Sequence, residues 1–142
     1  MGLWIPMFGG RVPDGAVAHG WEADGKPLYV ARAYLNGGLH IGKVRGEFNA
    51  ANIPYGGREE KVFNYEVFMG PGVWVFAEGG RIPMNAVAYG YEASGETLFA
   101  ARAFLNGGLH PGKVRPAFGA ANIPWGGAEV KVPRYEVLVL GS

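Results

Sequence analysis

Residues 28–44 read LYVARAYLNGGLHIGKV, and residues 98–114 read LFAARAFLNGGLHPGKV. In each copy, a run rich in β-branched, aromatic and small residues leads into a Gly-Gly pair, and a further expected strand begins at the Lys-Val pair that ends the stretch. Strands joined by a tight turn show this pattern, whereas paired glycines would interrupt a helix. The stretch therefore predicts the same turn-linked strands twice, and with them an all-β fold.

The rest of the chain repeats with the same spacing. When the sequence is shifted by 70 positions it aligns with itself without a gap, and more than half of the aligned positions are identical. We therefore predict two tandem repeats, residues 1–70 and residues 71–142. The join at residues 69–72 has no Ser-rich or charged linker, so we expect the halves to pack together with pseudo-two-fold symmetry in a sandwich-like arrangement.

Other segments of the first repeat also have the composition of strands. The pair Asp24-Gly25 predicts a type I′ hairpin in which Trp21 faces Leu28. Residues 50–53 are expected to form a link. The expected strands cover residues 3–7, 16–23, 27–35, 43–48 and 61–69.

The composition argues against several classes of protein. With 13 basic and 12 acidic residues, the chain lacks the basic excess that binds a nucleic-acid backbone. No apolar run is long enough to insert across a membrane. The chain has no cysteine, so it has neither disulfides nor thiolate metal sites. The first residues show no secretory signal, so we expect a cytoplasmic protein, with secretion by another route left open.

The reactive residues do not form a catalytic set. The two serines and one threonine lie outside the known nucleophile motifs. The three histidines lack the close spacing of a metal site. Acidic twins such as Glu59 and Glu129 would suit a glycosidase only at a fixed separation, which nothing in the sequence provides. We therefore expect no enzyme activity, no metal and no cofactor.

Two pairs of equivalent residues have two interpretations each. Arg32 and Arg102 stand in Ala-Arg-Ala within expected strands, where an arginine either forms an internal ion pair, with Glu66 as a candidate partner, or binds a ligand. His40 and His110 follow Gly-Gly-Leu turns, so they either line a seam across the pseudo-two-fold axis or are solvated. We expect ion pairs for the arginines and solvated rings for the histidines.

Five motifs in the same order, found twice, resemble the DM-nine repeat family. They cover nearly the whole chain, and members of that family commonly carry two tandem repeats. The first copy has GWE (20–22), LYVARA (28–33), HIGKV (40–44), ANIPYGG (51–57) with Glu59, and NYEV (64–67). The second copy has GYE (90–92), LFAARA (98–103), HPGKV (110–114), ANIPWGG (121–127) with Glu129, and RYEV (134–137).

The resemblance implies an all-β fold of interlocked repeats and, from characterised members, a lectin that binds mannose and high-mannose glycans without calcium. It also implies that an acidic residue and a lysine of one repeat hold the sugar hydroxyls. The matching positions are Glu22 with Lys43, and Glu92 with Lys113. The lectin members have Asp where this chain has Glu, so the acidic side chain is longer by one methylene. The family also suggests a homodimer.

The chemistry of these pairs suits a sugar. A carboxylate accepts hydrogen bonds and an ammonium donates them, so together they match hydroxyls that do both. We expect both groups to face solvent at sheet edges. Nearby rings would pack on the apolar face of the sugar, and the candidates are Trp21, Tyr91, Tyr55 and Trp125.

Two such sites in one chain predict a multivalent lectin. A single shallow site is expected to bind a monosaccharide with roughly millimolar affinity. Two sites raise the avidity toward clustered glycans by ~10²–10⁴. The alternative is a protein-interaction module that binds no sugar, because other family members are linked to innate immunity or intracellular vesicles. The Glu–Lys pairs would then be ordinary surface ion pairs.

Overall fold

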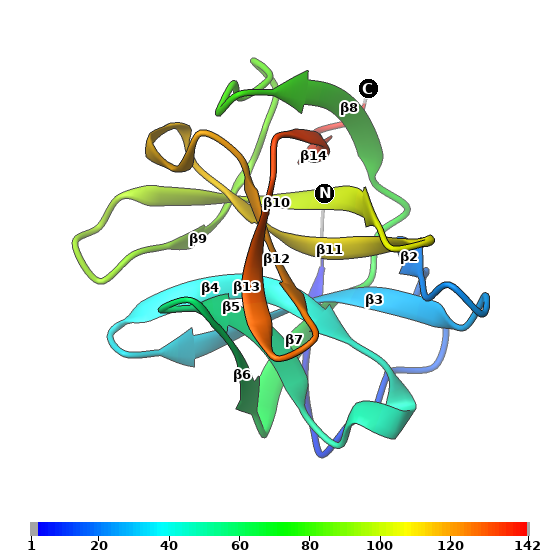
Figure 1. Cartoon of the computed structure of the whole chain (residues 1–142). Helices are drawn as coiled ribbons and strands as arrows, with labels where there is room; N and C mark the ends of the chain where they lie inside the picture. Colours follow the sequence, from blue (N-terminus) through cyan, green and yellow to red (C-terminus); the bar gives the residue numbers. More distant parts are fainter. Residues whose placement is uncertain (1–2, 142) are drawn as a thin grey trace.

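The computed structural model describes residues 3–141, so residues 1, 2 and 142 of the predicted repeats lie outside it. The fold is all-β, as the sequence predicts (Figure 1). The first repeat contains β1 (Trp4–Phe8), β2 (Gly20–Trp21), β3 (Pro27–Leu35), β4 (Gly38–Val44), the 3₁₀ turn η1 (Gly46–Phe48), β5 (Ala51–Tyr55), β6 (Arg58–Val62) and β7 (Asn64–Phe68). The second contains β8 (Val73–Glu78), β9 (Ala88–Tyr91), β10 (Thr97–Leu105), β11 (Gly108–Val114), η2 (Pro116–Phe118), β12 (Ala121–Trp125), β13 (Ala128–Val132) and β14 (Arg134–Val139).

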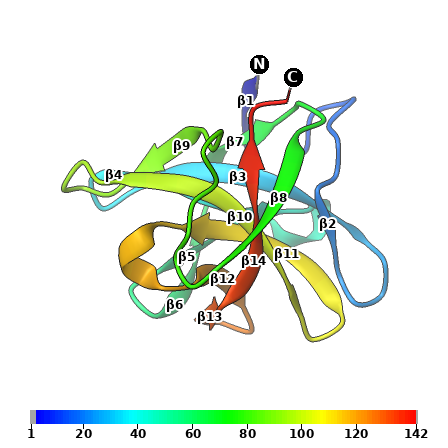
Figure 2. The same cartoon turned by 90° about the horizontal axis from the view of Figure 1, so that it is seen from above.

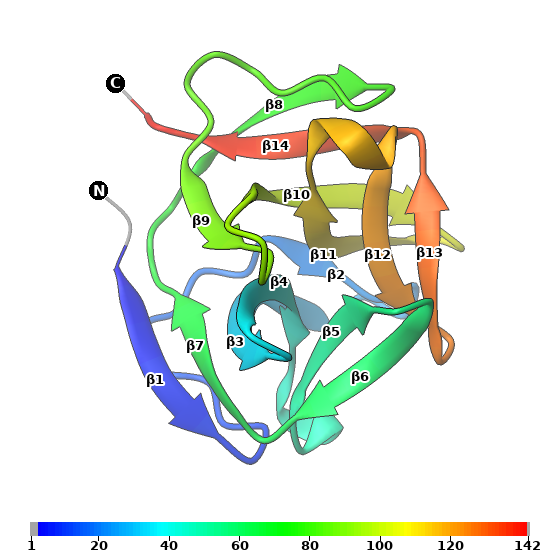
Figure 3. The same ribbon diagram turned by 90° about the vertical axis from the view of Figure 1, so that its left-hand side faces the viewer.

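The two repeats are interleaved. The strands form one hydrogen-bonded series in the order β1-β7-β3-β2-β11-β12-β13-β6-β5-β4-β9-β10-β14-β8, with additional pairing of β3 with β4 and of β10 with β11. Strands of different repeats meet where β2 pairs with β11, β6 with β13, and β4 with β9. Figure 2 shows β2 beside β11, and Figure 3 shows β6 and β13 meeting where the halves adjoin. Each repeat thus completes the sheet of the other.

Buried apolar residues form three clusters. One lies within the first repeat around Tyr65 and Val67, and one within the second around Tyr135 and Val137. The third joins the repeats, with Val30, Ile41 and Phe68 from the first and Leu98, Ala100 and Leu138 from the second. The halves therefore share a core, which agrees with the absence of a linker between them.

Glycine is required where the repeats exchange strands. β2 lies so close to β11 that a Cβ at Gly20 would collide with the carbonyl oxygen of Leu109. At the equivalent crossing of β9 and β4, a Cβ at Gly90 would collide with the carbonyl oxygen of Leu39. Any side chain at these positions would separate the strands.

Two arginines stabilise the same strand crossings. Their contacts with glutamates confirm the predicted ion pairs. Arg102 donates from Nε to Glu136 in its own repeat (2.7 Å) and from Nη1 to the carbonyl oxygen of His19 in the other (2.9 Å). The equivalent bonds join Arg32 to Glu66 (2.7 Å) and to the carbonyl oxygen of Tyr89 (2.8 Å). Each arginine thus also binds the backbone of the segment that the other repeat contributes to the crossing.

The hairpin around Asp24-Gly25 differs from the prediction in its register. Trp21 pairs with Pro27 rather than with Leu28. Of the two predicted turn residues only Gly25 has a positive φ, of 91°, whereas a type I′ turn needs a positive φ at both. The loop therefore contains one more residue than predicted, and the pairing shifts by one.

Several predicted boundaries are also wrong. Of residues 16–23 only β2 is a strand, and residues 43–48 end in the turn η1. Residues 50–53, which the sequence predicts as a link, lie mostly in strand β5. Strand β5 pairs with β4 at Asn52, two residues before Pro54. Pro54 has no N–H, but at its position no hydrogen bond between β5 and β4 is interrupted. Residues 61–69 divide between β6 and β7, which pair with different strands.

We predict that Gly20→Ala lowers the free energy of unfolding by about 1–3 kcal/mol, because the added methyl group overlaps the backbone of β11. Gly46→Ala is the matched control, since a Cβ there meets nothing within 4 Å among the described residues. Urea denaturation of both variants tests the prediction. Equal midpoints would show that the strand crossing tolerates a side chain.

Candidate functional site

Lys43 and Lys113 each bind a histidine of the other repeat. Lys43 Nζ lies 2.9 Å from His110 Nδ1, and Lys113 Nζ lies 2.9 Å from His40 Nδ1. Both lysines are only 2% exposed. The expectation that they face solvent is therefore wrong, and so is the expectation of solvated histidines. The reason is that β4 and β11 are buried along their whole length between strands of both repeats.

Burial shifts the pKa of all four groups. It lowers the pKa of Lys43 and of Lys113 to about 8, because desolvation disfavours the charged form, and nearby carboxylates partly oppose the shift. Burial and the adjacent lysine charge lower the pKa of His40 and of His110 to about 4. At neutral pH each pair is thus an ammonium that donates to a neutral imidazole.

The predicted acidic partners, Glu22 and Glu92, lie near the lysines but pair with arginines. Glu22 Oε2 is 3.1 Å from Arg45 Nε, and Glu92 Oε2 accepts from Arg115 Nε at 3.0 Å. The charge of each glutamate still raises the pKa of the lysine in its own repeat. The side chains of Glu22 and Glu92 are 21% and 19% exposed. Each cluster therefore has a partly exposed carboxylate and a buried ammonium.

A second carboxylate joins each cluster, and the sequence analysis did not assign it to the site. Glu129 Oε2 lies 3.9 Å from Lys113 Nζ. This carboxylate accepts from Asn122 Nδ2 (3.0 Å) in its own repeat and from the Gly57 N–H (2.9 Å) in the other. Its twin Glu59 has the equivalent bonds, and its charge raises the pKa of the other lysine. The sequence signal was a glutamate retained in both copies two residues after a Gly-Gly turn.

Tyr55 belongs to the cluster of the opposite repeat. Lys113 Nζ lies 5.4 Å from the centroid of its ring, and the His40 ring packs edge-on against it with centroids 4.9 Å apart. Trp125, the twin of Tyr55 in β12, remains partly exposed. A predicted stacking residue is thus beside a predicted lysine, but the two come from different repeats.

The other two predicted rings lie on the exchanged strands. Trp21 in β2 packs edge-on against Phe104, with centroids 6.3 Å apart. Tyr91 holds the equivalent place in β9, where it pairs with Leu39.

Two further features concern residues 3–141 as a whole. In this part of the chain, no three His, Cys, Asp or Glu side chains gather in a way that would hold a metal ion. Over the same range, no helix combines the length and the apolar character needed to cross a membrane.

The fold and the two clusters define a protein of two interleaved all-β repeats with a charged site duplicated at their junction. The family model described as DM9 repeat matches residues 2–62 and 49–132. The chain belongs to the DM9 repeat family, as its motifs predict. Among curated proteins, none matches the chain.

We expect the free energy of unfolding to fall as the pH decreases from 6.5 to 4. Histidines in the unfolded chain bind protons below pH 6.5, whereas His40 and His110 in the folded chain do so only near pH 4. The variant His40→Gln/His110→Gln keeps a hydrogen-bond acceptor but does not titrate. In this variant, the loss of unfolding free energy at low pH should be smaller by on the order of 2 kcal/mol per histidine.

Urea denaturation at pH 7 and pH 4.5 measures this loss in both proteins. The same difference between the two pH values in the wild type and in the variant would contradict the prediction.

Proposed function

We propose that this protein is a lectin that binds mannose and high-mannose glycans without a metal ion, through twin sites around Lys43 and Lys113. One observation carries the proposal. Within residues 3–141, the hydrogen bond that each buried ammonium makes is to a histidine, although an ammonium has three N–H donors. Membership of the DM9 repeat family is compatible with a carbohydrate-binding role.

A sugar hydroxyl is a suitable partner for such an ammonium. Leaving buried donors of a charged group unpaired costs free energy, and a hydroxyl oxygen that accepts from the ammonium recovers part of that cost. A hydrogen bond to a charged donor is also stronger than one between neutral groups. Lys113 therefore offers more to a hydroxyl than a solvated lysine would.

The carboxylates complete the match to vicinal hydroxyls. Glu92 is partly exposed, so its oxygens are available to accept from a hydroxyl beside the one that the ammonium binds. The cluster contains Glu92 and Glu129 against Lys113 and Arg115, so its charges balance. A balanced cluster of donors and acceptors suits a neutral ligand with many hydroxyls better than it suits an ion.

The aromatic residues provide an apolar surface for the sugar ring. Tyr55 already lies against the Lys113 cluster, and Trp125 is the equivalent residue for the other site. Pyranose rings have an apolar face that packs on such side chains.

We propose binding without turnover. Glu59 and Glu129 each accept hydrogen bonds from an amide side chain and from a backbone N–H, so both carboxylates are already positioned as acceptors. Each site is weak, with roughly millimolar affinity for mannose. Two sites in one chain, and four in the homodimer that we propose, supply avidity for clustered glycans.

The lysines provide the direct test. Calorimetry with mannose in EDTA should give about two sites per chain and no binding of galactose. Lys43→Met/Lys113→Met, which keeps an unbranched chain but removes the donors, should weaken binding by more than tenfold, about 1.4 kcal/mol or more.

Lys61→Met/Lys131→Met is the matched control, because it removes the same charge from exposed twins in β6 and β13, which pair with neither β4 nor β11. Circular dichroism of both variants checks the fold. If no sugar binds to the wild type at millimolar ligand, the lectin proposal fails and the protein-interaction module becomes the better hypothesis.

The pH dependence of binding gives a second test. We expect affinity for mannose to fall as the pH rises through about 8, where Lys43 and Lys113 lose their protons and one donor each. The histidines remain neutral throughout this range, since their pKa lies near 4. Calorimetry between pH 6.5 and 9.5 measures the effect, and a constant affinity would contradict a role for the ammonium.

A further inference from the structure

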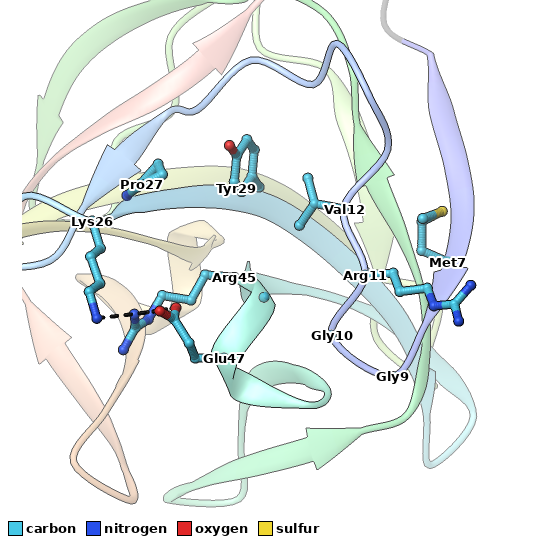
Figure 4. Close-up of a pocket in the computed structure, with 11 residues that line it drawn as sticks. Met7, Gly9, Gly10, Arg11, Val12, Lys26, Pro27, Tyr29, Arg45 and Glu47 are labelled. Atoms are coloured by element: carbon cyan, nitrogen blue, oxygen red, sulfur yellow. Dashed lines mark hydrogen bonds and ion pairs between the residues drawn. The ribbon is translucent and has the colours of Figure 1, made fainter.

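The first repeat has a cleft of about 640 Å³, and one of its lining residues, Arg45, pairs with Glu22 of the Lys43 site. It lies between the loop of residues 9–12, strand β3 and the turn η1 (Figure 4). Its walls combine apolar groups, among them Val12 and Tyr29, with the charged side chains of Lys26, Arg45 and Glu47. Cavities of this size accept ligands larger than a single sugar unit.

Close packing holds the walls of the cleft in place. A Cβ at Gly10 would lie 2.8 Å from the carbonyl oxygen of Gly46, so the loop rests directly on the turn η1. The hydroxyl of Tyr65 donates to the carbonyl oxygen of Arg11 at 2.7 Å and fixes the same loop to β7. The cleft is therefore formed before any ligand arrives.

A row of ion pairs runs from the cleft to the proposed mannose site. Lys26 Nζ lies 3.3 Å from Glu47 Oε2, and Arg45 Nη1 donates to Glu47 Oε1 at 2.6 Å. Arg45 Nε in turn lies 3.1 Å from Glu22 Oε2. Two cations and two carboxylates alternate along this row, so it offers donors and acceptors to hydroxyls without attracting an ion. The Tyr29 ring adds an apolar face.

We propose that this cleft binds the inner sugar units of a mannose oligosaccharide whose terminal unit occupies the Glu22–Lys43 site. The inference rests on the proposed function. Arg45 connects the two parts, because its guanidinium both contacts Glu22 and lines the cleft. The first repeat then binds an extended ligand.

The second repeat has different residues at the equivalent positions. Lys26 is replaced by Glu96, Gly46 by Pro116 and Glu47 by Ala117. Arg115 consequently faces two carboxylates, with Glu92 at 3.0 Å and Glu96 at 3.2 Å, and the lysine donor is missing. The two repeats therefore differ in function: the first recognises an oligosaccharide and the second recognises a terminal sugar.

The chain itself supplies the test variant. Lys26→Glu/Glu47→Ala gives the first repeat two of the residues that its twin carries, and both wild-type side chains are exposed (51% and 60%), so the fold should tolerate the change. Lys61→Glu/Glu78→Ala changes the net charge by the same amount at exposed positions outside the cleft and is the control.

Calorimetry with mannose and with linear mannotriose separates the outcomes. In the wild type and the control, one of the two sites should bind mannotriose about tenfold tighter than mannose. In Lys26→Glu/Glu47→Ala that gain should disappear while the affinity for mannose stays the same.

A variant that keeps the gain overturns the inference, and so does a wild type that binds mannose at both sites but shows no gain with mannotriose. Neither result affects the proposed function. A wild type that binds no mannose at all overturns both.

Discussion

The exchange of short strands between the repeats is the constraint on which the rest of the molecule depends. β2 reaches β11 and β9 reaches β4 only because Gly20 and Gly90 bring no side chain to the crossing. The arginines then hold the carbonyl groups of the exchanged segments, and the apolar cluster shared by the repeats fills the space beneath. Because each repeat is incomplete alone, the junction is a covered interior rather than a surface between two domains. That interior is where the lysines and histidines meet.

Two ammonium groups in such an interior require compensation, since a buried charge is costly unless it is paired and hydrogen-bonded. Here the compensation is distributed. A neutral imidazole of the other repeat accepts one hydrogen bond, and two carboxylates of the lysine's own repeat stabilise the charge from a greater distance. This compensation of the buried charge is incomplete, because the pKa of Lys113 is still lowered to about 8. A group kept charged at neutral pH but short of partners is suited to binding a polar ligand, and this links the folding constraint to the proposed function.

The sequence predicts the parts of this structure that depend on local pattern. β3 has the predicted bounds, and the pairing of Arg32 with Glu66 follows from two strands of one repeat lying side by side. The exchange between repeats is beyond such prediction, because both copies carry the same residues. Lys43 has an identical histidine available in either repeat, so the sequence alone does not choose between His40 and His110. The burial of the lysines likewise follows from the exchange, which places β4 and β11 between strands of both repeats, and the expectation that they face solvent failed for this reason.

The exchange also explains which differences the two copies have accumulated. A contact between side chains of opposite repeats constrains both copies. Changing one histidine would leave the lysine of the other repeat without its partner. Lys43, Lys113 and both histidines are accordingly identical in the two copies. Where the partner is a backbone carbonyl the side chain is free to vary, and the carbonyl that Arg102 binds belongs to His19 while the one that Arg32 binds belongs to Tyr89. The ion pairs that join Lys26, Arg45 and Glu47 in the cleft lie within the first repeat. No side-chain partner in the other repeat constrains these ion pairs. The two copies have diverged at the positions of Lys26, Gly46 and Glu47. Interleaving therefore preserves the shared site in duplicate and leaves its surroundings able to specialise.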